Sequence, residues 1–375
     1  MSTIFFIFII LLFTYLTIAF NILTSKLSKV EANQRELETL LSEQSQTKDA
    51  WNACRDAVKE YNETLKKFPF IMVAGIFGFK TIFNEEFEED WRMTENMEYV
   101  KLNNGLEMPM LGFGSFRVED GRDAVDAVKA ALAAGYRSID TAAVYGNEKS
   151  IGIAIKESGV PREEIFLTTK LWNEVQRTGN AEEAFEQSLK DLGTDYVDLY
   201  LIHWPVKEKY VESWLTLEKI YKSGRAKAIG VSNFKEHHLE DIRKVWSVVP
   251  AVNQVELHPF LTQKPLLEYC KNLNIAPQSW GPLGGTLGRY GVRESLLEND
   301  VIKSIGAKYG KTAAQVILRW NIDSGIVAIP KSTTPGRIKE NIDIFDFSLT
   351  KDEIEAIDSL NKDQRVGSDP DTFDF

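Results

Sequence analysis

The chain has 375 residues and a formal net charge of −11, so it can bury a large core but repels polyanions such as nucleic acid. Its two cysteines, Cys54 and Cys270, are too few for a disulfide framework or a zinc site built from thiolates. No H-E-x-x-H pattern occurs and the four histidines show no metal-ligand spacing, so we expect no bound metal. Because of the negative net charge, we expect no nucleic-acid partner either.

The first 24 residues predict a transmembrane anchor. Ile4–Leu23 is almost entirely apolar and uncharged, and a helix of this length spans about the 30 Å of a bilayer core. Lys26 and Lys29 follow this run, and basic residues stay on the cytoplasmic side, so we expect a single-pass membrane protein whose remainder faces the cytosol. A cleaved signal peptide and a buried helix are the alternatives, but a basic start and an A-x-A cleavage site are missing.

Residues 25–67 predict a helical stalk. No Gly or Pro occurs before Pro69, and apolar residues recur at a seven-residue spacing from Val30. The stalk can form a coiled coil and mediate self-association, or it can be a lone amphipathic helix lying on a membrane or on the rest of the protein. Residues 68–96 begin with a short apolar stretch that favours an interfacial segment over a span, and continue as an acidic linker.

The remainder, residues 97–375, predicts a (β/α)8 barrel of the α/β class. It starts with a hairpin pattern around Asn104-Gly105. Apolar strand patterns then alternate with helical patterns eight times, and a glycine ends helices such as 124–135 and 181–193. We expect the strands at residues 110–116, 137–140, 165–169, 197–202, 226–231, 251–257, 275–280 and 326–330.

Four protic side chains follow neighbouring predicted strands, where the active site of such a barrel lies. Asp140 ends the second strand, Tyr145 lies just beyond it, Lys170 ends the third and His203 ends the fourth. A phenol can protonate a developing alkoxide when an ammonium stabilises the phenolate, and an acid can hold that ammonium in place. An imidazole can orient the carbonyl and assist proton transfer. This set predicts carbonyl reduction by hydride transfer, with Tyr145 as general acid.

A basic cluster after the eighth strand predicts the cofactor. No G-x-G-x-x-G follows the first strand, which excludes a Rossmann site. Lys331, Ser332 and Arg337 instead offer two cations and a hydroxyl at the start of a helix, in the loop where this barrel commonly binds phosphate. A 2′-phosphate fits these groups, so we expect NADPH rather than NADH.

These motifs resemble the aldo-keto reductases across residues 97–375. The chain contains, in order, GYRSIDTA-x-YGNE, K-LW, IHWP, GVSNF, NQVELHP and IPKS-x-x-P-x-R-I-x-EN. Residues 279–285, 310–320 and 365–375 look most like the branch of 2,5-diketo-gluconate reductase and prostaglandin F synthase. The resemblance implies an NADPH-dependent reductase that acts on a small-molecule carbonyl substrate.

The resemblance also assigns site residues. It implies a catalytic tetrad of Asp140, Tyr145, Lys170 and His203. It implies a cofactor site made of Ser232, Asn233, Gln254 and Trp280 at the nicotinamide, Gly281, Leu283 and Gly285 at the pyrophosphate, and Lys331, Ser332, Thr333, Arg337, Glu340 and Asn341 at the adenosine end. Substrate contacts are expected from Phe116, Trp172 and His203, and Trp204 can extend the apolar wall. Phe116 replaces a tryptophan found in many members, so specificity cannot be copied from them.

Two other functions are compatible with such a chain. One is a non-catalytic regulatory subunit that senses the nicotinamide redox state, and the other is a membrane scaffold assembled by the stalk. The intact set of four protic residues favours an enzyme over both.

Overall fold

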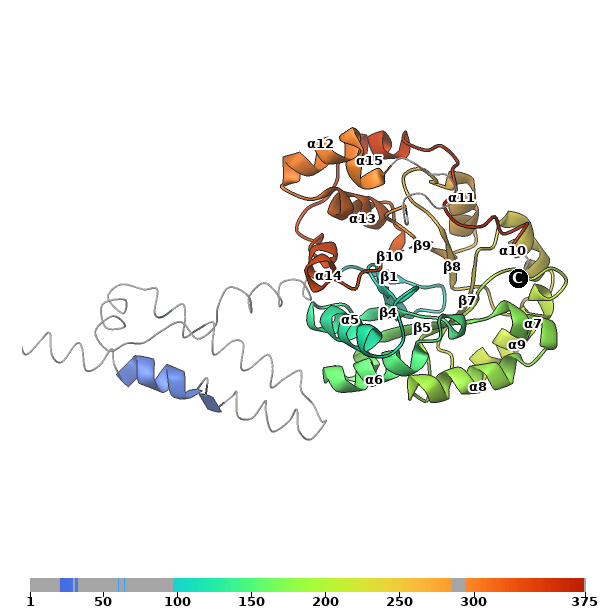
Figure 1. Ribbon diagram of the computed structural model, residues 1–375, viewed down its shortest axis with the longest axis horizontal. Coiled ribbons are helices and arrows are strands. Elements are labelled where there is room, and N and C mark those ends of the chain that lie inside the picture. The colour runs from blue at the N-terminus through green and yellow to red at the C-terminus, as the bar shows by residue number, and fades with distance from the viewer. Residues whose placement is uncertain are drawn as a thin grey trace, which may run out of the picture. The chain divides into compact units, whose positions relative to one another are not determined.

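A computed structural model describes residues 21–29, 31, 32, 60, 64, 97–284 and 295–373 of the chain. The chain divides into two compact units, Met1–Glu89 and Asp90–Phe375 (Figure 1). The second unit holds all the described strands.

In the N-terminal unit the described residues are helical. Lys26 and Glu60 form an ion pair of 2.6 Å, so these two turns lie side by side. In one straight helix Lys26 and Glu60 would lie about 50 Å apart, so these two residues do not belong to one straight helix. None of the described helices is both long and apolar enough to cross a bilayer. The predicted anchor up to residue 20, most of the stalk and the segment 68–96 lie outside the described residues.

Eight parallel strands form the centre of the second unit, as predicted. Each strand pairs with the next one along the chain. The ring closes where Gly112 donates its backbone N–H to the Ala328 carbonyl at 2.8 Å and Ala328 donates to Met110 at 2.9 Å. The strands are β3 (Phe113–Gly114), β4 (Ser138–Asp140), β5 (Phe166–Leu171), β6 (Leu199–Ile202), β7 (Ile229–Ser232), β8 (Val252–Glu256), β9 (Ala276–Trp280) and β10 (Val327–Ile329).

The predicted hairpin is present and covers one end of the barrel. Strands β1 (Tyr99–Lys101) and β2 (Glu107–Pro109) pair antiparallel, and Gly105 in their turn has a φ of 89°, which favours glycine. Asn103 and Asn104 donate to the carbonyls of Pro250 and Lys227, both just before the strands β8 and β7. The hairpin therefore lies at the N-terminal ends of the strands, opposite the predicted catalytic residues.

Helices surround the strands (Figure 1). A parallel strand pair needs a crossover, and a helix with one apolar face supplies it. Helix α5 shows this pattern, because its buried residues recur at three and four. The helices are α5 (Arg122–Ala133), α6 (Glu148–Ser158), α7 (Asn173–Thr178), α8 (Ala181–Leu192), α9 (Tyr210–Lys222), α10 (Glu236–Arg243), α11 (Lys264–Asn272), α12 (Asp300–Tyr309), α13 (Ala313–Asp323), α14 (Pro335–Ile342) and α15 (Lys351–Asp358).

The contact between α6 and α8 generates a stability prediction. A β-carbon on Gly152 of α6 would overlap the Leu192 carbonyl at the end of α8. We expect Gly152→Ala to lower the free energy of unfolding of the barrel by about 1–3 kcal/mol, because the two backbones must separate. Gly336→Ala is the control, since nothing lies within 4 Å of that position. Urea unfolding followed by tryptophan fluorescence measures both, and equal stability of the two variants would contradict the prediction.

Candidate active site

The C-terminal ends of three neighbouring strands bring the four predicted residues together. Asp140 is the last residue of β4, and Tyr145 ends a short 3-10 turn, Ala143–Tyr145, that follows it. Lys170 lies in β5 and His203 directly follows β6. Because the strands are parallel, their carboxyl ends meet at one edge, and segments far apart in sequence become neighbours.

The Lys170 ammonium is the centre of this arrangement. Its side chain is completely buried, so its charge must be paired and hydrogen-bonded. The Nζ atom lies 2.6 Å from Asp140 Oδ1, 2.8 Å from the Thr141 carbonyl oxygen and 3.5 Å from the Tyr145 hydroxyl. An ammonium has three donors, and each has an acceptor here.

A second carboxyl group supports this lysine and was not assigned a role from the sequence. Burial lowers the pKa of Lys170, and Asp140 and then Glu148 oppose that shift. Glu148 is buried at the start of α6 and accepts hydrogen bonds from Thr169 at 2.6 Å and Ser188 at 3.2 Å. Its own pKa is raised, chiefly by burial. Glu148 is the last residue of the YGNE motif, and that motif is the sequence signal that points to Glu148 as part of the site.

Tyr145 keeps its proton in this environment. Desolvation first, and the Asp140 charge second, raise the pKa of the phenol well above its usual range. The residue types predict that the Lys170 ammonium stabilises the phenolate. In the structure that ammonium lies much closer to Asp140 than to the phenol, so it stabilises the carboxylate more strongly. The phenol is therefore neutral and keeps a hydroxyl proton that it can donate in a hydrogen bond.

His203 is neutral as well. Burial and the nearby Lys170 charge hold the pKa of its imidazole well below the usual range. Its ring meets the rings of Tyr145 and Trp172 edge-on, with centroids 5.6 and 5.3 Å apart. Its buried Nδ1 atom has no hydrogen-bond partner among the described residues. A neutral imidazole beside the phenol suits the orienting role better than proton transfer.

The residues predicted for the nicotinamide form a connected network next to these four. Gln254 donates to Asp140 Oδ2 at 2.7 Å, and Ser232 donates to the Gln254 carbonyl at 2.8 Å. Asn233 accepts from the Trp280 indole N–H at 2.8 Å. Asn233 has a φ of 64°, a left-handed conformation that asparagine tolerates. The structure thus brings this predicted group into contact with the tetrad.

The residues predicted for the phosphates lie on two loops. Gly281 and Leu283 form a turn directly after β9, while Gly285 lies outside the described residues. Lys331, Thr333 and Arg337 are exposed around the start of α14. Neither Lys331 nor Arg337 has an ion pair within the part of the chain that the structure describes.

The other three residues of the adenosine group are engaged within the protein. Ser332 accepts a hydrogen bond from the backbone N–H of Thr334 at 3.1 Å. Glu340 accepts one from the Thr312 hydroxyl at 2.7 Å, and Asn341 is buried. The Ser332 and Glu340 side chains therefore help to hold the loop and α14 in place.

Aromatic side chains surround the phenol and the imidazole. Phe116 is 53% exposed, and its ring centroid lies 5.0 Å from that of Tyr145. Trp204 stacks on Phe373 of the C-terminal tail, with centroids 4.0 Å apart and planes at 23°. The tail is held at Gly367, whose N–H donates to buried Glu256. Trp204 is thus a wall residue of the kind the sequence predicts, but no sequence pattern indicates its partner in the tail.

The chain matches known proteins closely. The model of the aldo/keto reductase family matches residues 110–362. A glyoxal reductase of Bacillus subtilis is 53% identical over 75% of this chain and 99% of its own length. A 9,11-endoperoxide prostaglandin H2 reductase of Trypanosoma cruzi is 50% identical over 75% of this chain and 98% of its own. The structure of a Bombyx mori aldo-keto reductase in complex with NADP has a TM-score of 0.69 at 38% identity, covering 73% of this chain and 96% of that one.

Proposed function

The chain belongs to the aldo/keto reductase family, and on that premise we propose that it reduces aldehydes or ketones to alcohols by hydride transfer from NADPH. One observation carries this proposal. The fully buried Lys170 ammonium lies between the Asp140 carboxylate and the Tyr145 hydroxyl, at the barrel end where chemistry takes place in this fold. A buried lysine is costly, and a set of partners that includes a phenol suits proton donation more than core packing.

In the proposed reaction the protein's own residues bind the carbonyl and supply the proton. NADPH, when bound, supplies the hydride to the carbonyl carbon. Tyr145 gives its hydroxyl proton to the carbonyl oxygen and recovers a proton from solvent afterwards. Neutral His203 donates a hydrogen bond to the same oxygen and orients it. The Lys170 ammonium lies 3.5 Å from the Tyr145 oxygen and stabilises the phenolate that forms when Tyr145 loses its proton, even though it stabilises the Asp140 carboxylate more strongly.

The donor set at α14 supports NADPH as the cofactor. A dianionic 2′-phosphate needs cations and hydrogen-bond donors, and a helix N-terminus adds a partial positive charge. Lys331 and Arg337 are exposed cations at this point. The Bombyx mori relative, whose structure was solved with NADP, supports the same choice.

We propose small aldehydes of the glyoxal kind as substrates. The 53% identity to the Bacillus subtilis glyoxal reductase supports this class. We further propose that the chain belongs to the branch of 2,5-diketo-gluconate reductase and prostaglandin F synthase. The 50% identity to the Trypanosoma cruzi relative supports this placement. Phe116 leaves more room beside Tyr145 than the tryptophan of many members would, so larger ketones are also compatible.

The N-terminal residues support a second proposal, about location. Ile4–Leu23 anchors the enzyme in a membrane as a single span, and Lys26 and Lys29 keep the barrel in the cytosol. The stalk that follows mediates self-association in this proposal. Both ideas rest on the sequence pattern, and neither is needed for the reductase chemistry.

Tyr145→Phe tests the proposed acid. The variant should lose turnover by on the order of 10²–10⁴, because a general acid is worth that much in rate, while NADPH binding stays nearly unchanged. Stopped-flow NADPH oxidation with glyoxal measures the rate, and quenching of tryptophan fluorescence measures binding. Tyr99→Phe, on the exposed hairpin, is the matched control. A Tyr145→Phe rate above about a tenth of wild type would remove Tyr145 as the acid.

Lys331→Ala and Arg337→Ala test the 2′-phosphate assignment. Each removes a charge-assisted contact worth roughly 1.5–3 kcal/mol, so NADPH binding should weaken by about tenfold or more while NADH binding changes little. Titration calorimetry with both cofactors measures the difference. Lys351→Ala, on exposed α15, controls for the loss of one positive charge. An equal loss for NADPH and NADH would refute the assignment.

Removal of residues 1–24 tests the anchor. Most of the truncated protein should move from the membrane to the soluble fraction, although the apolar stretch at 68–83 can retain weak binding. For topology, protease is added to sealed microsomes that also contain a lumenal marker. We expect the barrel to be digested while the marker survives. A barrel that stays protected until detergent is added would place it on the opposite side of the membrane.

A further inference from the structure

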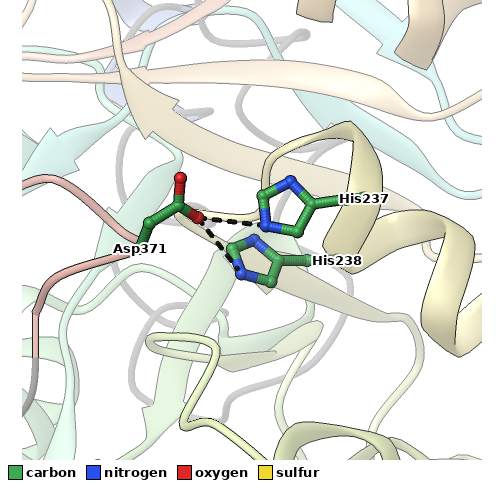
Figure 2. Close-up of side chains that lie close together, drawn as sticks. All are labelled: His237, His238 and Asp371. Carbon is green, nitrogen blue, oxygen red and sulfur yellow. Dashed lines mark ion pairs between the residues drawn. The ribbon is translucent and has the colours of Figure 1, made fainter.

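Two adjacent histidines face one carboxylate outside the candidate active site. His237 and His238 lie in the first turn of α10, and Asp371 belongs to the C-terminal tail (Figure 2). Figure 2 shows both rings directed at the same Asp371 carboxylate. The Oδ1 atom lies 3.0 Å from His237 Nε2 and 3.6 Å from His238 Nε2. The sequence offered no sign of this group, because the histidines and the aspartate are far apart in the chain.

The spacing of these atoms suits a tetrahedral metal ion. Zinc holds nitrogen and oxygen ligands at about 2.0–2.2 Å, which puts neighbouring ligand atoms roughly 3.3 Å apart. The two Oδ1–Nε2 distances lie on either side of that value, and all three ligand atoms lie within 4.8 Å of one another. His237 is 58% exposed, so an ion can enter and keep a water in the fourth position.

The surrounding charges permit a cation. Lys235 donates to Asp371 at 2.6 Å, but it uses Oδ2 and leaves Oδ1 facing the histidines. The same ammonium also pairs with Asp369 at 2.7 Å, and Arg365 is shared between Asp369 and buried Glu256. Three carboxylates therefore surround two cationic side chains. The group of Asp369, Asp371 and Glu256 thus carries one negative charge more than Lys235 and Arg365 neutralise, and this charge can balance part of the charge of an incoming ion.

His238 makes the site weaker than one with two unconstrained histidines. The Lys235 backbone N–H donates to His238 Nδ1 at 3.2 Å, so the ring proton lies on Nε2. A metal on Nε2 moves that proton to Nδ1, and the contact with the backbone N–H must open. His238 Nε2 lies 3.6 Å from Asp371 Oδ1, which is too long for a good hydrogen bond. Nε2 therefore gives up little hydrogen bonding when it binds a metal instead. We therefore expect exchangeable binding rather than a structural ion.

We propose that His237, His238 and Asp371 bind a divalent transition-metal ion of the zinc class, which ties the C-terminal tail to α10. Imidazole nitrogens select such ions over magnesium and calcium. The tail runs from Gly367, against the Trp280 indole, to Phe373, stacked on Trp204. An ion at Asp371 therefore holds the tail segment that covers Trp204.

Zinc titration of the full-length protein tests the site. Calorimetry should show a site that binds Zn²⁺ and not Mg²⁺. His237→Ala and His238→Gln should each weaken it by at least about 10–100-fold, the loss that even an outer partner of a ligand causes. Glutamine at position 238 keeps a capping acceptor at the third residue of the helix. Unchanged zinc binding in both variants, or none in the wild type, would overturn the proposal.

Asp369→Asn is the matched control. It removes a carboxylate from the same tail turn, but asparagine keeps the oxygen that accepts the Asp371 N–H. Zinc binding should persist in this variant, and a loss as large as that of His237→Ala would mean a diffuse charge effect and overturn the site. Hydrogen exchange then tests the tie to the tail. Zn²⁺ should slow exchange of the peptide 365–373 in the wild type and in Asp369→Asn but not in His237→Ala, and equal slowing in His237→Ala would refute the tie. Both readouts are independent of reductase turnover.

Discussion

The buried ammonium of Lys170 is the constraint on which the candidate site depends. A lysine with no exposed surface needs an acceptor for each of its donors. Asp140, the Thr141 carbonyl and the Tyr145 hydroxyl meet that need, and they come from the neighbouring strand and the turn after it. The same charge helps to keep His203 neutral. Burial comes first in setting the pKa values of this cluster, and the Lys170 charge and its Asp140 partner act on the phenol and the imidazole in addition.

Parallel strands make that placement possible. They collect the carboxyl ends of β4, β5 and β6 at one end of the barrel, while the β1–β2 hairpin covers the other end. Gln254 extends the cluster across the barrel, because one amide group reaches both Asp140 and Gln278. The proposed cofactor network and the proposed tetrad are thus parts of one hydrogen-bonded unit.

The C-terminal tail adds a second layer to the same end of the barrel. Glu256, buried at the end of β8, accepts the backbone N–H groups of Val366 and Gly367. Further along, the acidic turn of the tail pairs with Lys235 beside α10, and Phe373 covers Trp204. These contacts use different elements of the barrel. The tail is consequently positioned by polar groups that the proposed chemistry does not use.

Local patterns in the sequence determined the barrel and the residues at its strand ends. Strand and helix periods, the Asn104-Gly105 turn and motifs such as YGNE depend only on near neighbours, so they predicted the eight strands and singled out the four protic residues. Tertiary structure alone decided the distances between these residues and the partners that no motif indicates. The preference of Lys170 for Asp140 over Tyr145, the support from Glu148 and the meeting of α10 with Asp371 join segments far apart in sequence. Distances and burial set the pKa shifts, and neither exists until the chain has folded.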